Sequence, residues 1–270
     1  MAPQCTYGFI GAGNMAGAII GGILTKNLAA AAQIGVYDID TQKTAAFAAQ
    51  GCRGFENIPA LCAESRFVFL AVKPQQFNAV LPEIGKSLRP DSVLVSIAAG
   101  ITAEAIKAGV GADCKVILAM PNTPLLLGQG ACALSRVPPA TQPELEQVKA
   151  LFAAAGIAEE IPPDKMNAII PINGSSPAFI YLFAKTLLDC AQTAGLPPAQ
   201  AHRLICQALI GSAHMLRDTG KTPDELIAMV CSPGGTTLAA LEAMENSGFA
   251  QAIQNGFSAC VKRADELAQS

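Results

Sequence analysis

The chain has 270 residues, a length that suits one large or two ordinary domains. Apolar residues make up 51% and charged residues 14%, but Pro, Gly, Asn, Lys or Asp interrupts every candidate run of about 18 apolar residues, which excludes a membrane span. The net charge of −3 gives no support for a nucleic-acid partner, and the nine scattered cysteines without a CxxC pair indicate reduced thiols and no metal site.

The first part of the chain alternates short apolar runs with helical patterns. Its first residues lack the basic segment of a signal peptide, so we expect a cytoplasmic protein. The run RFVFLAV at 66–72 is fully apolar, as expected of a parallel strand buried on both faces. Further strands are predicted at 7–10, 33–37, 92–99 and 115–120, and helices after the turn at 11–13, from Thr41 as N-cap, and over 74–88. The alternation predicts an α/β domain with a doubly wound sheet of parallel strands over residues 1–160.

The pattern changes after the sequence IPPDK. No convincing strand follows it, and the second domain, residues 161–270, is predicted to be entirely helical. Helices are expected at about 164–194, 198–219, 223–231, 236–246 and 248–268. Their wide apolar faces are typical of helices that pack against another subunit, so we expect a homodimer through this domain.

A glycine-rich turn near the N-terminus is the first motif that carries chemistry. Gly11-x-Gly13-x-x-Ala16 follows a predicted strand and opens a predicted helix. Gly11 permits the tight turn, Gly13 lets a pyrophosphate approach the backbone, and Ala16 lets helix and strand pack closely. Asn14 and Met15 begin the helix whose N–H groups face the phosphates. The motif predicts a dinucleotide site, and the alternative is a tight turn without a ligand.

The choice between NADH and NADPH depends on the end of the second strand. Asp38 stands where an acidic residue binds the ribose hydroxyls of NAD, which favours NADH. For the 2′-phosphate of NADPH, Thr41 and Lys43 are the only nearby candidates. Two alternatives stay open, since Asp38 could turn away or cap the next turn, and Asp40 could be the helix cap.

Two more stretches follow strands at the edge where ligands bind in open α/β sheets. AVKP at 71–74 presents Lys73 either to the cofactor or to solvent at the rim. MPNTP at 120–124 has two prolines with fixed φ angles, which make either a rigid shelf for a nicotinamide ring or a stiff turn between domains. From these two stretches the predicted cofactor-binding set includes Ala71, Val72, Lys73, Pro74, Met120, Pro121 and Asn122, and the set also includes Asn57.

The stretch CSPGGTTLAALEAME at 231–245 is the most informative part of the second domain. Pro and two glycines precede Thr236 and Thr237, where a helix begins. Exposed N–H groups at a helix start, with hydroxyls beside them, suit a small carboxylate. The alternative is ordinary helix capping by Thr236. The chain has only two histidines, and neither stands in a catalytic context.

Together these stretches resemble the pyrroline-5-carboxylate reductases. The similarity spans nearly the whole chain and is carried by GAGNMAGAI at 11–19, LAVKPQ at 70–75, SIAAGI at 96–101, MPNTP at 120–124, NGSSPAFIY at 173–181 and CSPGGTTLAALE at 231–242. The combination of MPNTP and SPGGTT is far more specific than the glycine motif. Three residues depart from the family pattern: Ser176 and Phe179 replace a Gly and a Tyr, and Asp38 replaces a small polar residue common in members that use NADPH.

The resemblance implies a Rossmann domain, a helical domain that interlocks with its twin, and in many members rings of dimers. It implies hydride transfer from NADPH or NADH to the C=N carbon of 1-pyrroline-5-carboxylate, which gives L-proline. By the resemblance, Thr237 bonds the substrate near its nitrogen as the catalytic residue. The rest of the implied substrate cradle is Ser232, Gly234, Gly235 and Thr236.

Two other functions stay open. β-Hydroxyacid dehydrogenases share this layout but use a catalytic lysine with an asparagine four residues later. Here Lys165 is followed by Asn at 167, and Lys185 has Asp189 at the fourth position. A sensor that binds NAD(P) without catalysis is the second alternative, and the intact carboxylate loop argues against it.

Overall fold

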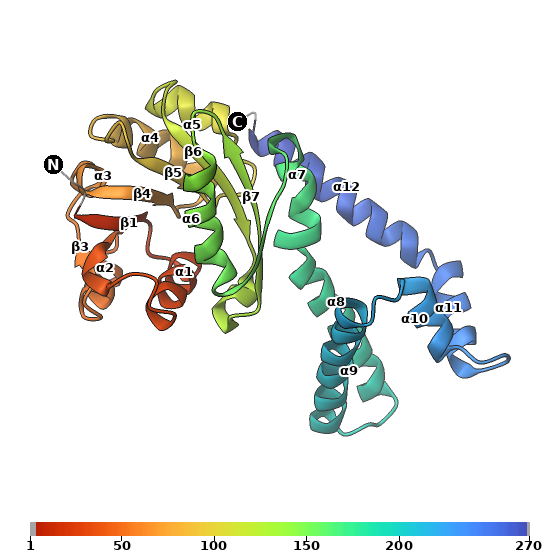
Figure 1. Cartoon of the computed structure of the whole chain (residues 1–270). Coiled ribbons are helices and arrows are strands. Elements are labelled where there is room, and N and C mark those ends of the chain that lie inside the picture. The colour runs from red at the N-terminus through yellow and green to blue at the C-terminus, as the bar shows by residue number, and fades with distance from the viewer. Residues whose placement is uncertain (1–3, 269–270) are drawn as a thin grey trace. The chain divides into compact units, whose positions relative to one another are not determined.

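The computed structural model describes residues 4–268, which form two compact units (Figure 1). The first contains the residues up to Ser175 and the segment from Ala259 onward, and the second is Ser176–Ser258. Helix α12 (Phe249–Ala268) crosses the division. By its contacts, the segment 161–175 thus groups with the first unit. The domain boundary at 160/161 stays a prediction.

An eight-stranded sheet forms the centre of the first unit. Its strands lie in the order β3-β2-β1-β4-β5-β6-β7-β8, and their chain order reverses between β1 and β4. All neighbouring pairs are parallel except β6 and β7. The strands are β1 (Cys5–Ile10), β2 (Ile34–Tyr37), β3 (Arg53–Gly54), β4 (Ser65–Leu70), β5 (Val93–Ser96), β6 (Lys115–Pro121), β7 (Gly130–Val137) and β8 (Gly156–Glu160).

The antiparallel strand β7 departs from the prediction of parallel strands. Only a short 3-10 turn, η3 (Thr123–Leu127), separates it from β6. A crossover to a parallel strand needs a dozen or more residues, so the chain turns back and pairs antiparallel. The register places Pro121 opposite Cys132 at the end of β6.

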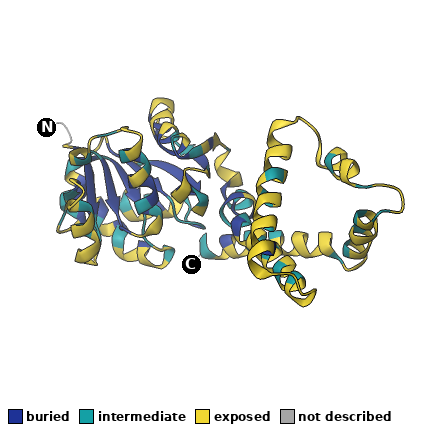
Figure 2. Cartoon of the chain, turned by 90° about the horizontal axis from the view of Figure 1, so that it is seen from below, coloured by how far each residue is buried: buried dark blue, intermediate teal, exposed yellow. Residues whose placement is uncertain are grey.

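Helices cover both faces of the sheet, as the doubly wound prediction requires. One face packs against α1 and α6, and the other against α3, α4 and α5. Figure 2 shows the strands as the buried layer between these helices. Phe9 and Phe69 stack in the first core with ring centroids 4.6 Å apart. The helices are α1 (Asn14–Thr25), α2 (Thr41–Ala48), α3 (Ile58–Glu64), α4 (Phe77–Gly85), α5 (Ala103–Val110), α6 (Gln142–Ala153) and α7 (Met166–Ile169), with 3-10 turns η1 (Ala31–Gln33), η2 (Pro74–Gln76) and η4 (Pro163–Lys165).

Three helix predictions need correction. The N-cap of α2 is Asp40, whose carboxylate accepts from the Gln42 N–H, so Thr41 is the first helical residue and not the cap. The predicted helix at 74–88 is a 3-10 turn followed by the shorter α4. The predicted helix at 164–194 is interrupted by a π-helical turn, η5 (Ile170–Gly174).

The second unit contains the four helices α8 (Ser176–Thr193), α9 (Pro198–Asp218), α10 (Pro223–Val230) and α11 (Thr236–Asn246), and the first part of α12. Many of its large apolar side chains are exposed, and Leu204 and Val230 are 71% and 69% exposed. Figure 2 shows these helices as almost wholly exposed. Such faces need a partner surface. Within residues 4–268, no helix is long and apolar enough to cross a membrane.

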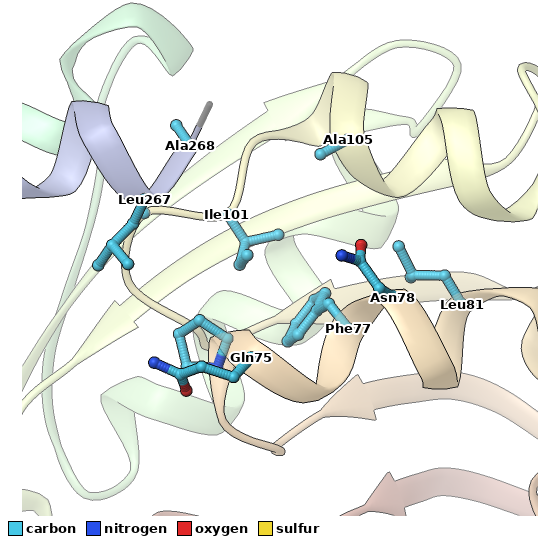
Figure 3. Close-up of a pocket in the computed structure, with 10 residues that line it drawn as sticks. Gln75, Phe77, Asn78, Leu81, Ile101, Ala105, Leu267 and Ala268 are labelled. Carbon is cyan, nitrogen blue, oxygen red and sulfur yellow. The ribbon is translucent and has the colours of Figure 1, made fainter. Parts of the chain in front are cut away.

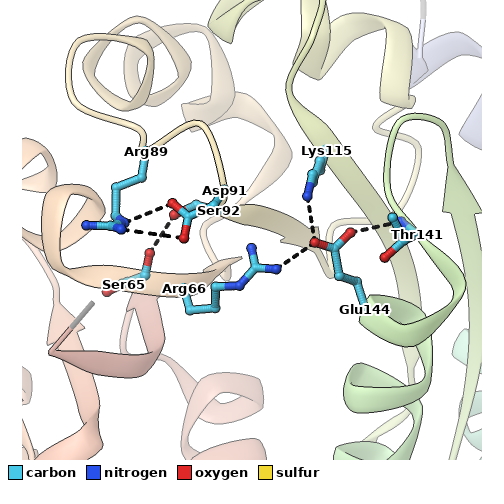
Figure 4. A network of polar contacts seen from close by, with 8 residues as sticks. All are labelled: Ser65, Arg66, Arg89, Asp91, Ser92, Lys115, Thr141 and Glu144. Carbon is cyan, nitrogen blue, oxygen red and sulfur yellow. Dashed lines mark hydrogen bonds and ion pairs between the residues drawn. The ribbon is translucent and has the colours of Figure 1, made fainter. Parts of the chain in front are cut away.

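A buried carboxylate joins three elements at the amino ends of the strands (Figure 4). Glu144 of α6 accepts from Arg66 of β4 at 2.6 Å and from Lys115 of β6 at 2.7 Å. Its other oxygen accepts from the Thr141 N–H and completes a capping box. Burial alone raises the pKa of Glu144, but the bonds from Lys115, Thr141 and Arg66 outweigh it and lower that pKa to about 2.

We expect Glu144→Gln to lower the free energy of unfolding by about 2–3 kcal/mol at pH 7, because it leaves two partly buried cations without their counter-charge. The folded-state pKa lies below the ordinary value of 4.5. The stabilisation is therefore complete above about pH 4.5 and disappears as the pH falls toward 2. Urea unfolding at pH 7 and pH 3 measures the difference, which should shrink at pH 3. Glu146→Gln, on the exposed side of the same helix, is the control; an equal loss in both variants contradicts the assignment.

Candidate active site

The predicted cofactor residues gather at one edge of the first unit's sheet. Because β2, β1, β4 and β6 run in the same direction, the residues that follow them lie at the same edge. Ligands of open α/β sheets bind at this edge, where the strand order reverses. In this sheet the reversal lies between β1 and β4. The structure brings together there the ends of four strands, with Asp38 after β2, Gly11 after β1, Ala71–Pro74 after β4 and Met120–Asn122 at β6.

The glycine turn leaves open space in which a phosphate can bind. A Cβ on Gly11, whose φ is +100°, would lie 2.6 Å from the Ala71 carbonyl oxygen, so only glycine fits. A Cβ on Gly13 would meet nothing within 4 Å. Gly13 is also the N-cap of α1, so the cap residue provides no side-chain bond to the N–H groups that Asn14, Met15 and Ala16 bring to the helix start. The turn therefore fits a dinucleotide pyrophosphate.

Asp38 is fixed against this turn. The Ala12 N–H donates to its Oδ2 at 2.7 Å, and the Asp40 N–H donates to its Oδ1 at 2.9 Å. Its own N–H donates to Thr44 Oγ1 at 3.1 Å. The side chain therefore does not turn away from the glycine loop. Asp40, in contrast, caps α2 and pairs with Lys43 at 3.8 Å.

The remaining predicted residues of the first unit differ in their environment. The Ala71 N–H donates to the Ile10 carbonyl at 2.8 Å, which holds the AVKP turn against the glycine turn. Lys73 is exposed at the start of η2, where its backbone N–H donates to the Gln76 side chain at 3.2 Å. Asn57 uses its Oδ1 to cap α3, accepting from the Ala60 N–H at 2.9 Å. A role in cofactor binding is a prediction for all of them.

A cavity of about 190 Å³ lies beside the AVKP turn (Figure 3). Its wall is mostly apolar and comes from α4, α5, the segment before α5 and the end of α12, including Phe77, Leu81, Ile101 and Ala105. Of the predicted cofactor residues only Pro74 lines it. The predicted dinucleotide residues therefore lie mostly outside this cavity, at the open edge of the sheet.

The MPNTP corner is held by a residue to which the sequence pattern assigns no role. Asn173, in the π-helical turn η5, donates to the carbonyls of Met120 and Ala131 and accepts from Asn122. It is 8% exposed. Its position in the NGSSPAFIY motif is the only sequence signal, because its contacts depend on a turn that sequence periodicity does not predict.

The predicted substrate loop of the second unit forms an open helix start. Gly234 has φ of +71°, and the Gly235 N–H donates to the Ser232 carbonyl at 2.9 Å. The N-cap of α11 is Gly235, which has no side chain to bond the first turn. Thr236 is therefore not the cap, and Thr237 is half-buried in that first turn. The backbone N–H groups of this turn suit a carboxylate.

The alternative catalytic candidates have ordinary surroundings. Lys185 is exposed and pairs with Asp189 at 2.6 Å, one helical turn away. His202 and His214 lie exposed on α9, and His214 contacts Asp218 at 3.1 Å. Within the described part of the chain, no three His, Cys, Asp or Glu side chains are placed to hold a metal.

The chain is similar to curated reductases over nearly its whole length. The pyrroline-5-carboxylate reductase of Escherichia coli (strain K12) is 38% identical over 264 residues, which cover 97% of this chain and 98% of that protein. The chain belongs to the pyrroline-5-carboxylate reductase family. Pyrroline-5-carboxylate reductase 3 of Danio rerio is 36% identical over a similarity that covers 98% of this chain and 92% of that protein. The predicted family, fold class and oxidoreductase class are thus confirmed.

Family models and a solved structure agree with this assignment for both parts of the chain. A model described as pyrroline-5-carboxylate reductase dimerisation matches residues 163–267, and one described as NADP oxidoreductase coenzyme F420-dependent matches residues 6–100. The crystal structure of Plasmodium falciparum pyrroline carboxylate reductase with NADP bound has a TM-score of 0.90 and 26% identity. The similarity covers 99% of this chain and 100% of that one.

Proposed function

We propose that this chain reduces 1-pyrroline-5-carboxylate to L-proline with NADH or NADPH. The observation that carries the proposal is a pair of helix starts without side-chain caps. In the first unit, α1 begins behind Gly13 and suits a pyrophosphate; in the second, α11 begins behind Gly235 and suits a small carboxylate. A dinucleotide and a small acid are the two reactants of this reaction.

The first unit provides the dinucleotide site of the proposal. The N–H groups of Asn14, Met15 and Ala16 face the pyrophosphate, and Gly11 keeps the turn tight. Asp38 accepts from ribose hydroxyls, and Met120–Asn122 form the shelf for the nicotinamide. When bound, the reduced nicotinamide supplies a hydride. The other proposed contacts are Asn57, Ala71, Val72, Lys73 and Pro74.

The second unit provides the substrate loop. The first-turn N–H groups of α11, with Ser232, Gly234, Gly235 and Thr236, bind the carboxylate of the imine. Thr237 contacts the ring near its nitrogen and orients it for attack at the neighbouring carbon. Transfer requires the imine carbon to lie about 3–3.5 Å from the hydride donor, so positioning contributes much of the rate.

The proton balance explains why the reaction needs no catalytic histidine. The C=N carbon gains a hydride and the nitrogen ends with a proton, so the imine becomes a secondary amine. A cyclic imine can carry that proton near neutral pH, before hydride transfer. The chain therefore has to orient the imine and exclude water, and a strong acid is not required.

The fixed carboxylate of Asp38 leads us to propose NADH as the better cofactor. A 2′-phosphate at the ribose would lie beside the negative charge of Asp38, whereas Asp40 is already paired with Lys43. Ribose hydroxyls can instead donate to the remaining lone pairs of Asp38.

The exposed apolar helices of the second unit support a homodimer formed through this unit, as its match to a dimerisation domain indicates. We also propose that dimers assemble into a larger ring, and that the protein is cytoplasmic. Light scattering should give at least twice the mass of one chain, and a monomer at micromolar concentration contradicts the dimer. A mass equal to two chains contradicts the ring.

A spectrophotometric assay tests the proposed reaction. Purified protein is incubated with 1-pyrroline-5-carboxylate and either NADH or NADPH. Loss of reduced-nicotinamide absorbance together with the appearance of proline is expected. Cofactor binding without turnover would contradict the proposal and favour the hydroxyacid or sensor alternatives.

A further inference from the structure

A π-helical turn directs one amide side chain into the sheet. In η5 the Ser175 N–H donates to the Ile170 carbonyl at 2.8 Å, five residues back and not four. A π turn widens the helix and changes the direction of its side chains. Ile172 is 60% exposed, whereas the next residue, Asn173, is 8% exposed. The turn thus buries a polar side chain beside the end of β6.

Asn173 bonds both strands at the MPNTP corner. Its Nδ2 donates to the carbonyl oxygens of Met120 on β6 and of Ala131 on β7, the latter at 3.1 Å. Its Oδ1 accepts from Asn122 Nδ2 at 3.2 Å. The neighbouring Gly174 leaves space for Met120, since a Cβ there would lie 3.3 Å from the Met120 sulfur. One side chain therefore fixes the shape of the corner through hydrogen bonds to Met120, Ala131 and Asn122.

The side chain of Asn122 replaces part of the sheet's own hydrogen bonding. The Ala131 N–H donates to Asn122 Oδ1 at 2.9 Å, and the Asn122 N–H donates to the Ala131 carbonyl at 3.2 Å. The two amides have a single consistent orientation. If Asn173 were flipped, its oxygen would face two carbonyl oxygens, and a flipped Asn122 would turn an NH₂ toward the Ala131 N–H. We call Asn122 and Asn173 the amide pair.

We propose that Asn173 is a positioning residue, which acts through Asn122 and the Met120 carbonyl to hold the nicotinamide shelf in its working shape. The inference rests on the proposed role of Met120–Asn122 as that shelf. A buried amide with three bonds has little freedom to move, so the corner is shaped before any ligand arrives. Hydride transfer depends steeply on the donor–acceptor distance, and a shelf displaced by about 1 Å can cost about 100-fold in rate.

Asn173→Ala and the milder Asn173→Ser test the inference. We expect kcat to fall about tenfold in Asn173→Ala. With cofactor deuterated at the transferred position, the primary isotope effect on kcat should rise, because hydride transfer becomes the slow step. In the protein without cofactor, deuterium exchange at the Ala131 N–H should become faster. Asn167→Ala is the matched control, since Asn167 donates to Asp265 at 2.7 Å and takes no part in the amide pair; it should change none of these values.

The outcomes separate this inference from the proposed function. Faster exchange in Asn173→Ala with an unchanged kcat and isotope effect means a merely structural role and overturns the inference. Unchanged exchange overturns it as well. If the wild type binds cofactor but does not reduce the imine, the proposed function is contradicted. The exchange measurement then still shows whether the amide pair holds the corner. Asn173→Ser should give intermediate values of kcat, of the isotope effect and of the exchange rate. It replaces Asn173→Ala in the test if Asn173→Ala does not fold.

Discussion

Thr237→Ala is expected to lower kcat for 1-pyrroline-5-carboxylate about 100-fold and to leave the Kd for the reduced cofactor within about twofold. Removal of one hydrogen-bonding group that acts on the reacting atoms typically costs about 100- to 1,000-fold in kcat. The resemblance to the pyrroline-5-carboxylate reductases assigns the Thr237 hydroxyl to the substrate. The structure leaves the hydroxyl without a capping role, because the N-cap of α11 is Gly235. Steady-state kinetics and fluorescence titration of the cofactor measure the two quantities.

The same unit offers a threonine with a purely structural role as the control. Thr222 caps α10: its hydroxyl accepts from the Glu225 N–H at 3.2 Å, and its own N–H donates to the Glu225 carboxylate at 2.7 Å. Thr222→Ala should cost about 1 kcal/mol of stability and leave kcat unchanged. Thr237→Ser keeps the hydroxyl and should retain most of the rate. An unchanged kcat in folded Thr237→Ala contradicts the catalytic assignment.

The sequence predicted the central strands of the sheet well, because their burial leaves a simple pattern. The run at 66–72 corresponds to β4, which ends at Leu70, and the run at 115–120 corresponds to β6. Both are buried on two faces and are therefore continuously apolar. In the second unit, Pro198 marks the first residue of α9, as a proline at the start of a helix commonly does.

The elements that were missed carry weaker local signals. Strand β8 (Gly156–Glu160) is short and ends in two glutamates, and β3 has only two residues, so neither shows a strand pattern. Helix α6 did have a signal, the capping box formed by Thr141 and Glu144. The direction of β7 follows from the length of the turn before it and from no property of its own residues.

The candidate site, like the fold, has some features that the sequence predicted and others that it did not. The shapes of the backbone features could be predicted, because a glycine turn after a strand and a proline-glycine loop before a helix are local in sequence, and the structure has both. Asn173 could not be predicted, since its role comes from a π turn and from two strands distant in sequence. Asp38 lies between these cases: its position at the end of β2 was predictable, and its bond to the Ala12 N–H was not.

Asp38→Asn is expected to shift cofactor choice toward NADPH. For the wild type we expect kcat/KM with NADH to exceed that with NADPH by at least about tenfold. A unit charge pair about 6 Å apart at an effective dielectric constant of about 20 is worth roughly 3 kcal/mol, and solvent reduces this value at a half-buried site. The substitution should therefore lower the NADH-to-NADPH ratio about 10- to 100-fold.

Asparagine is the informative replacement at this position. It keeps the shape of Asp38 and one oxygen that can accept from the Ala12 N–H, loses the bond from the Asp40 N–H, and removes the charge that repels a 2′-phosphate. Asp40→Asn is the matched control, because Asp40 caps α2 and already pairs with Lys43; it should change the ratio less than threefold. Both cofactors are assayed on the same sample, so any loss of folded protein cancels in the ratio. A wild type that prefers NADPH contradicts the role of Asp38 in cofactor choice, and so does an unaltered NADH-to-NADPH ratio in Asp38→Asn. An equal shift of the ratio in Asp40→Asn would place the discriminating charge on the α2 cap instead.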